Sequence, residues 1–302
     1  MISLANEFLR GSYTPVITPF DDGKVNYEKF AELVDRQARE GSDGIVVTGT
    51  TGEPGSLTTD ERIELVKAAV DAVAKRIPVV AASGSQSFAE TTQLTTAAEK
   101  AGADAVLVVT PYYSKPPQAG LVDYFTEVGK RTSLPLLIYH IPGRAAVSIT
   151  ATTIATIAER SPNLVGMKHA ANDLEFVTEV LARLGSDFRV FCGLEALSLP
   201  MLVLGAAGLM NAVGNLAPAM VARLCQLVEQ GDLAGARAMH FELFELNQSI
   251  FLETNPIPLK YMMARMGLLE TSEVRLPLVA MDPGRGKILD GVLSRAGLWK
   301  QA

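Results

Sequence analysis

A lysine ends an apolar run in the middle of the chain, where residues 165–168 read Val-Gly-Met-Lys. An ammonium group taken out of water is costly unless it is paired, reaches solvent or loses its charge, so Lys168 needs a reason for its place. One reason is ordinary: a long lysine stem covers apolar surface while its head reaches water. The other is chemical: a neutral lysine amine attacks a ketone and forms a Schiff base.

Polar side chains follow several other apolar runs in the same way. The segments concerned are TGTTGE (48–53), TPYY (110–113) and YHIPGR (139–144). Glycines and threonines in a turn can place N–H groups and hydroxyls around a carboxylate or phosphate, although such turns are often plain turns. Tyrosines here have an equally ordinary explanation in packing, and the arginine in a surface ion pair. The argument for a functional role of these polar side chains is that they gather at one place in the fold.

A protonated imine on Lys168 would act as an electron sink, so that a bond beside the former carbonyl breaks or forms without a metal. The three histidines, His140, His169 and His240, do not have the spacing of a metal motif. We therefore expect no metal and no organic cofactor. His140 and His169 follow two of the apolar runs, so we expect both on the same rim as Lys168.

Strands must position these residues, and eight apolar runs are candidates. The runs lack clean alternation, which is typical of parallel strands buried on both faces. The segments between them have helix signals, including two pairs in capping-box spacing, Thr58 with Glu61 and Ser87 with Glu90. This order predicts an α/β protein with a (β/α)8 TIM barrel, whose functional residues lie at the carboxyl ends of the strands. The runs lie at 12–18, 44–48, 78–82, 105–109, 135–139, 164–168, 188–192 and 208–213.

Beyond about residue 215 the strand signals stop and the sequence reads as helices. We expect a barrel domain over residues 1–230 and a C-terminal helical extension, a bundle over residues 231–302, that packs on the barrel. Pro256 and Pro258 should break the longest helix of this extension. No flexible linker separates the two parts, so the extension is not an independent module.

Composition narrows the class of partner. The 302 residues are 48% hydrophobic and 20% charged, with a net charge of −6, as in an ordinary globular protein. No dense basic run suits nucleic acid or an anionic membrane, and no apolar stretch is long enough to span a bilayer. With no leader-like start and only Cys192 and Cys225, we expect a cytoplasmic protein that acts on a small molecule.

The motifs GTTGE, TPYY, Y-x-x-P-x-R and G-x-K, in this order and spacing, resemble those of the dihydrodipicolinate synthase and N-acetylneuraminate lyase superfamily of class I, Schiff-base pyruvate aldolases. The resemblance extends to NPIP at 255–258 and covers nearly the whole chain. It implies a lyase that condenses pyruvate with an aldehyde, or cleaves a 2-oxo acid to pyruvate. It also implies a homotetramer made of two tight dimers.

The resemblance assigns catalytic roles to four residues. Lys168 would form the imine with the keto carbon of pyruvate, and Tyr139 would transfer protons beside it. Thr50 would link Tyr139 to Tyr113 in a hydroxyl relay, in which Tyr113 reaches across a subunit interface.

Substrate-binding roles follow from the same resemblance. The turn at Thr50 and Thr51 would hold the pyruvate carboxylate through its N–H groups and the Thr51 hydroxyl, and Arg144 would orient the carboxylate of the aldehyde. The implied substrate-binding residues are Gly49, Thr51, Arg144 and Met210.

Departures from the synthase pattern leave the aldehyde open, and we expect them on the rim that meets the second substrate. They are Ala145 and Ala146 in place of Thr-Gly, His140 in place of Asn, His169 with Ala170 and Ala171 in place of Glu-Ala-Thr, and CGLE at 192–195 in place of SGDD.

Two interpretations remain nearly even. One is a synthase that makes 4-hydroxy-tetrahydrodipicolinate from pyruvate and aspartate semialdehyde. The other is a catabolic 2-oxo acid aldolase or dehydratase, such as 2,4-dihydroxyhept-2-ene-1,7-dioate aldolase. A silent pyruvate-binding relative leaves the proton-shuttling Tyr139 without a use, and a phosphate-using barrel isomerase explains neither Lys168 nor Tyr139.

Overall fold

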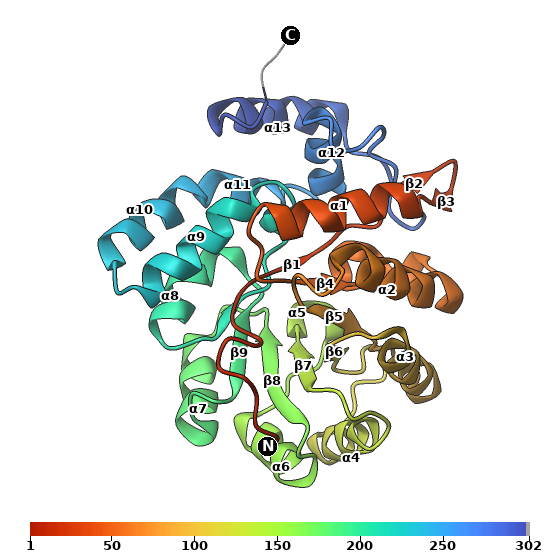
Figure 1. The fold of residues 1–302 in the computed structure, drawn as a ribbon, viewed down its shortest axis with the longest axis vertical. Helices are drawn as coiled ribbons and strands as arrows, with labels where there is room; N and C mark the ends of the chain where they lie inside the picture. The colour runs from red at the N-terminus through yellow and green to blue at the C-terminus, as the bar shows by residue number, and fades with distance from the viewer. Residues whose placement is uncertain (300–302) are drawn as a thin grey trace.

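Eight parallel strands close into a barrel in the computed structural model, which describes residues 1–299 (Figure 1). The order around the barrel is β1-β10-β9-β8-β7-β6-β5-β4, so each strand lies beside the next one along the chain and the last closes on the first. The predicted (β/α)8 barrel is confirmed. The strands are β1 (Gly11–Pro15), β4 (Gly44–Val47), β5 (Val79–Ala82), β6 (Ala105–Val109), β7 (Leu136–His140), β8 (Leu164–His169), β9 (Arg189–Cys192) and β10 (Gly208–Leu209).

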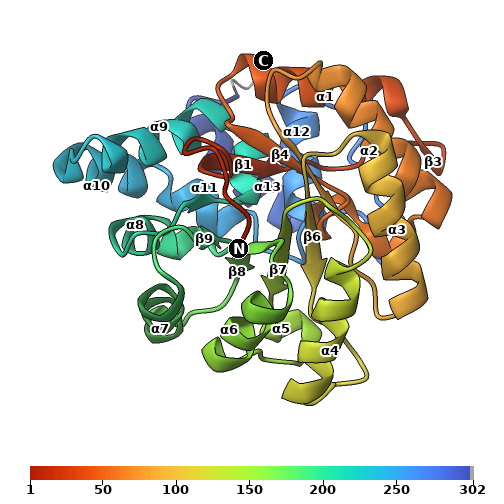
Figure 2. The same cartoon turned by 60° about the horizontal axis from the view of Figure 1, so that its bottom comes forward.

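Helices connect the strands and surround the barrel, as the two views in Figures 1 and 2 show. The predicted capping box of the second helix is present, because Thr58 and Glu61 each accept the other's backbone N–H. The one predicted at Ser87 is half present: Ser87 accepts the N–H of Glu90, but the Glu90 carboxylate accepts the Ser85 hydroxyl instead. The helices are α1 (Tyr27–Arg39), α2 (Thr59–Val73), α3 (Phe88–Ala101), α4 (Gln118–Gly129), α5 (Pro142–Ala145), α6 (Ala151–Arg160), α7 (Leu174–Leu184), α8 (Ser198–Val203) and α9 (Pro218–Glu229).

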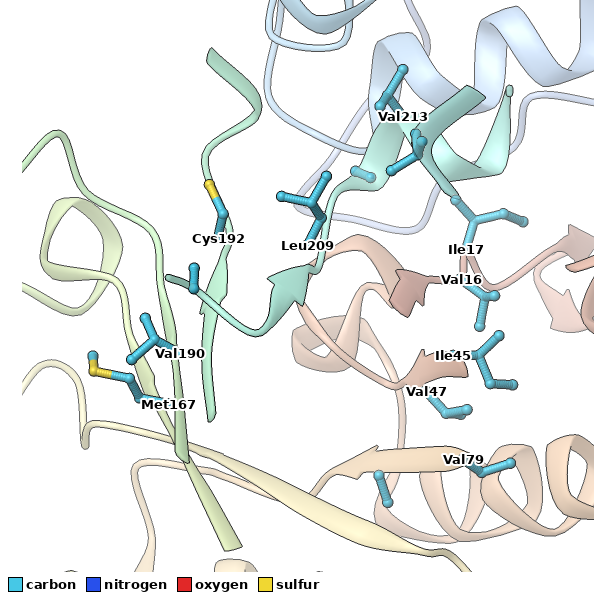
Figure 3. Packing of buried hydrophobic residues seen from close by; sticks show 14 of the residues in the cluster. Val16, Ile17, Ile45, Val47, Val79, Met167, Val190, Cys192, Leu209 and Val213 are labelled. Atoms are coloured by element: carbon cyan, nitrogen blue, oxygen red, sulfur yellow. The ribbon is translucent and has the colours of Figure 1, made fainter. Parts of the chain in front are cut away.

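Residues alternate between two buried layers along each strand. One set packs outward in a core shared with the helices, and Ile45, Val47 and Val79 in Figure 3 belong to it. The other set fills the barrel interior, where Val46 and Val80 pack. Both faces are therefore apolar, which explains why the strands read as continuous apolar runs.

The C-terminal helices pack on the barrel through the same outer core, which joins Leu246, Ile257 and Leu289 to Val16 and Ile17. The longest helix predicted for this extension is interrupted before it reaches the prolines, and Pro256 and Pro258 stand at the start of the next helix, where proline is tolerated. The predicted boundary at residue 230 falls between α9 and α10, and the division into two domains stays a prediction. The helices are α10 (Leu233–Glu242), α11 (Phe244–Ser249), α12 (Ile257–Arg265) and α13 (Pro283–Arg295).

A short antiparallel hairpin, β2 (Phe20–Asp21) with β3 (Lys24–Val25), follows β1 outside the barrel. No apolar run indicated it, because each strand has only two residues. Over residues 1–299, no helix combines the length and the apolar character needed to cross a bilayer.

Candidate active site

Lys168 and Tyr139 are neighbours at the carboxyl ends of two adjacent strands. Tyr139 on β7 pairs in register with Lys168 on β8. Both side chains are nearly buried, with 6% and 7% of their surfaces exposed. The Nζ atom of Lys168 lies 4.7 Å from the centre of the Tyr139 ring, a distance at which the negative ring face attracts the cation. The structure thus places the predicted nucleophile against the predicted proton-transfer group.

Gly193, just after β9, makes room for the lysine. A Cβ atom at this position would lie 2.5 Å from Cε of Lys168, closer than side-chain carbons ever approach. This glycine is not among the predicted site residues. The available signal was its place directly after the strand next to the lysine strand.

Thr50 provides the first link of the predicted relay. Its hydroxyl lies 3.3 Å from the Tyr139 hydroxyl, within hydrogen-bond reach. Tyr113 is not part of this arrangement within one chain, because its side chain is 89% exposed. Its neighbour Tyr112 lines the cavity instead. The second link of the relay therefore stays a prediction that needs another subunit.

The predicted carboxylate-binding turn follows β4. Thr50 and Thr51 open a short 3-10 helix, so their backbone N–H groups lie at its first turn, where helices leave N–H groups unbonded. The Gly49 carbonyl accepts the N–H of Gly52 at 2.8 Å, which closes the turn. Thr51 is buried, and its hydroxyl oxygen accepts a hydrogen bond of 3.0 Å from the side-chain amide of Asn255.

A cavity of about 550 Å³ opens beside this turn, a volume typical of small-molecule sites. Thr50, Tyr139 and Arg144 line it, together with two further arginines, Arg62 and Arg275. Glu53 and Glu90 also line it. Arg62 is paired with Glu90, and Arg275 with Glu61. Arg144 is therefore the arginine of this wall that has no ion pair within residues 1–299, and it suits a substrate carboxylate. Lys168 does not itself line the cavity, but it contacts Tyr139, which does.

Met210 lies in the barrel interior, and its substrate-binding role stays a prediction. It is 1% exposed and packs in the barrel interior with Tyr139 and Phe191, and it does not line the cavity. Its backbone N–H bonds the Cys192 carbonyl at 2.7 Å, which joins the end of β10 to β9. Met210 supports the site from within the core.

His140 and His169 form a buried pair on the opposite face of β7 and β8. Their Nδ1 atoms are 3.1 Å apart, and both rings pack on Phe176 of α7. Burial, reinforced by His169, lowers the pKa of His140 to about 4, and burial also lowers the pKa of His169. The prediction that these residues meet the second substrate is wrong, because strand alternation turns them outward while Tyr139 and Lys168 face inward.

In the loop after β9, Gly193 packs against Lys168, whereas Glu195 does not line the cavity. Glu195 is 2% exposed and accepts the backbone N–H of Ala212 at 2.7 Å. Burial raises the pKa of its carboxyl. Among the positions that depart from the synthase pattern, Ala145 does line the cavity.

A buried ion pair joins the turn to the C-terminal helices. Lys260 of α12 and Glu53 at the end of the turn place Nζ and Oε1 2.5 Å apart, with each side chain 1% exposed. Burial raises the pKa of Glu53 and lowers the pKa of Lys260, while the attraction between the two charges opposes both shifts. Neither Lys260 nor Glu53 is among the predicted site residues, although Lys260 follows the NPIP motif closely in the sequence.

Across residues 1–299, no three His, Cys, Asp or Glu side chains gather as ligands for a metal ion. The expectation of a cofactor-free imine stays a prediction.

Comparisons with known proteins agree with the geometry. Residues 8–294 match the model of the dihydrodipicolinate synthetase family. A 4-hydroxy-tetrahydrodipicolinate synthase of Thermus thermophilus is 46% identical, over 96% of this chain and 97% of the relative. The crystal structure of dihydrodipicolinate synthase from Aquifex aeolicus has a TM-score of 0.95 and 38% identity, and covers 97% of this chain and 100% of that one. A chloride-inhibited dihydrodipicolinate synthase from Acinetobacter baumannii, complexed with pyruvate, has a TM-score of 0.93 and 34% identity, over 96% and 99% of the two chains. The chain belongs to the dihydrodipicolinate synthetase family.

Proposed function

We propose that the protein is a 4-hydroxy-tetrahydrodipicolinate synthase, which condenses pyruvate with aspartate semialdehyde. Family membership confirms the prediction of a lyase of the class I aldolase type. The observation that carries the proposal is the contact of Lys168 with Tyr139, whose hydroxyl meets Thr50 at the mouth of the carboxylate-binding turn. The name of the relatives favours the synthase over the catabolic aldolase.

The first half of the reaction activates pyruvate. The neutral Lys168 amine attacks the keto carbon, and loss of water gives the protonated imine. The turn at Thr50 and Thr51 holds the carboxylate, which fixes the keto carbon beside the amine. Tyr139 donates a proton to the former keto oxygen of pyruvate and accepts a proton from the lysine nitrogen. The Thr50 hydroxyl takes part in this transfer through its contact with the Tyr139 hydroxyl.

The second half forms the new carbon–carbon bond. A proton leaves the methyl carbon of the imine, and its electron pair moves toward the iminium nitrogen to give an enamine. The enamine carbon attacks the aldehyde carbon, whose oxygen takes a proton. The amino group of the semialdehyde then attacks the imine carbon, closes the ring and releases Lys168. The sum is one pyruvate and one aspartate semialdehyde converted to product and one water. The imine is the electron sink throughout, so we propose that no metal or organic cofactor takes part.

The aldehyde would bind in the cavity beside the turn. Arg144 is exposed on its wall and carries no side-chain ion pair within residues 1–299, so its guanidinium is available to a substrate carboxylate. Three residues that differ from the synthase pattern do not line this cavity: His140, His169 and Glu195. Ala145 is the departure from the synthase pattern that lines the cavity.

The test compares two aldehydes. Purified protein is given pyruvate with aspartate semialdehyde or with succinate semialdehyde, which lacks the ring-closing amino group, and pyruvate consumption is followed. We expect clear preference for aspartate semialdehyde. Preference for succinate semialdehyde would contradict the proposal and favour a catabolic aldolase of dicarboxylic hydroxy-keto acids. Reductive trapping of pyruvate with borohydride serves as the control that the protein is competent.

We also propose a homotetramer built of two tight dimers. The support is the exposure of Tyr113, which the relay needs and which one chain leaves outside the site. Sedimentation of the purified protein tests the assembly, and a monomer with full activity would contradict it. The cytoplasmic location stays a prediction.

A further inference from the structure

The turn after β4 has an unusual backbone that its neighbours must hold. Thr48 and Glu53 have φ values of 54° and 56°, in the left-handed region that residues other than glycine rarely adopt. Such strain persists only where the surrounding structure fixes it. The barrel contributes two anchors, because the Thr18 hydroxyl donates to the Gly52 carbonyl at 2.8 Å and the Thr48 hydroxyl donates to the Ala82 carbonyl of β5 at 3.0 Å. Further anchors of the turn come from α12 and the loops that flank it.

Lys260 fixes the end of the turn. Its ammonium lies 2.5 Å from the Glu53 carboxylate, donates to the Glu273 carbonyl at 2.8 Å and sits over the Phe20 ring, 4.1 Å from its centre. The second oxygen of Glu53 accepts the backbone N–H of Arg275 at 3.3 Å. Because both charges are buried, each is stable only with the other in place. The position of Glu53 therefore depends on Lys260.

Asn255 determines the direction of a hydrogen bond in the same turn. Its side-chain N–H donates to the Thr51 hydroxyl oxygen, and an amide N–H can only donate. The Thr51 hydroxyl must then give its own hydrogen to another acceptor. Within residues 1–299, no protein group accepts it. Thr50 and Asn255, which flank Thr51 in sequence and in space, line the cavity, so a carboxylate bound there is the acceptor that we assign to this hydroxyl.

We infer that Asn255 and Lys260 are positioning residues of the pyruvate site. Asn255 commits the Thr51 hydroxyl to donate to the substrate carboxylate, and Lys260 holds, through Glu53, the turn that carries this hydroxyl. The C-terminal helices thus complete the site. The inference rests on the proposed function, because pyruvate supplies the carboxylate.

The test of Asn255 measures the pyruvate concentration that gives half-maximal borohydride labelling, together with kcat at saturating pyruvate. Asn255→Ala should raise this concentration about tenfold, the worth of one hydrogen bond to a charged group, and change kcat much less. In a Thr51→Val background the same substitution should have an effect of less than about twofold, because its partner is gone. Asn255→Asp has nearly the same shape but accepts the Thr51 hydrogen, so it should raise the concentration further.

Tyr261→Phe is the matched control for Asn255→Ala. Tyr261 lies on α12 beside Lys260, but its hydroxyl bonds Asp290 at 3.1 Å, away from the turn. The inference would be overturned if Asn255→Ala raised the half-labelling concentration equally in the parent and in the Thr51→Val background. It would also be overturned if Tyr261→Phe raised this concentration as much as Asn255→Ala does. The inference would also be overturned if the parent is labelled and Asn255→Ala and Asn255→Asp have the same half-labelling concentration as the parent. No labelling of the parent at all would overturn the proposed function, and this inference with it.

Lys260 has its own test, by rescue. Lys260→Met leaves the Glu53 carboxylate buried without its partner, so the half-labelling concentration should rise at least tenfold in the folded protein. Adding Glu53→Gln removes the uncompensated charge and should recover part of this loss. A double variant that binds pyruvate no better than Lys260→Met would overturn the role assigned to the pair.

Discussion

Lys168 and Tyr139 meet because they share a face of two paired strands. Tyr139 is opposite Lys168 in the register of β7 and β8, and both point into the barrel. The sequence predicted this convergence, since residues after parallel strands gather at one rim. It could not predict which partner the Thr51 hydroxyl finds, because Asn255 is 204 positions away in the chain.

The phenol of Tyr139 should matter for turnover more than for pyruvate binding. Tyr139→Phe keeps the ring beside Lys168 but removes the hydroxyl that meets Thr50 at 3.3 Å. We expect kcat to fall on the order of 100-fold, as for the loss of a general acid–base group. Steady-state kinetics with both substrates measures this change. A variant with parent-like kcat would show that protons travel by another route.

Gly193 should be required for the pose of the lysine. Gly193→Ala places a methyl group where Lys168 Cε now lies, so the amine must move and pyruvate labelling should slow on the order of 100-fold. Gly120→Ala is the control, because a Cβ there meets only ordinary contacts of 3.5 Å or more. Equal labelling rates for the two variants would contradict the close packing of Lys168 against Gly193.

Strand and helix patterns could be predicted from sequence wherever burial on both faces left a continuous apolar run. The β2–β3 hairpin was not predicted because its short strands bury little surface. Of the capping box predicted at Ser87, only one hydrogen bond forms, because the Glu90 carboxylate accepts the Ser85 hydroxyl. The outward direction of His169 was available in principle. A residue that follows an inward-facing lysine on a strand must face outward.

The histidine pair should make stability depend on pH. The folded pKa of His140 is about 4, below the ordinary value of 6.5, so the unfolded chain binds the proton more readily. This contribution to stability is therefore nearly full above about pH 7.5 and is lost as the pH drops toward 4, by about 1.6 kcal/mol between pH 6.5 and 5 for this one group. Asp173, which favours protonation of both histidines, limits the effect.

Urea unfolding of the parent and of His140→Asn at pH 5 and pH 7.5 measures this contribution. The midpoint of the parent should fall more on acidification than that of His140→Asn, whose amide can still bond His169. A parent and a variant with the same pH dependence would show that the pair does not resist protonation.

The proposed assembly would bring together parts that one chain leaves apart. Tyr113 is exposed, and in the proposed dimer a second chain supplies it to the relay. Subunits of Lys168→Ala and Tyr113→Phe, refolded together, should then regain activity, because a mixed dimer has one complete site. Random pairing in a two-fold dimer predicts about a quarter of the parent activity.

The control for this experiment mixes Lys168→Ala with Tyr139→Phe. Both residues belong to the site of a single chain, so no mixed dimer restores a site and no activity should return. Recovery in the control, or its absence with Tyr113→Phe, would contradict the shared site.

Reductive trapping tests the central claim most directly. Pyruvate and borohydride are added to the parent and to Lys168→Ala, and the labelled peptide is found by mass spectrometry. We predict one label per parent chain, on Lys168, and none on the variant. Lys260, the other deeply buried lysine within residues 1–299, should stay unlabelled because its ammonium is paired with Glu53. A label on another lysine, or full labelling of Lys168→Ala, would contradict the assignment of Lys168 as the nucleophile.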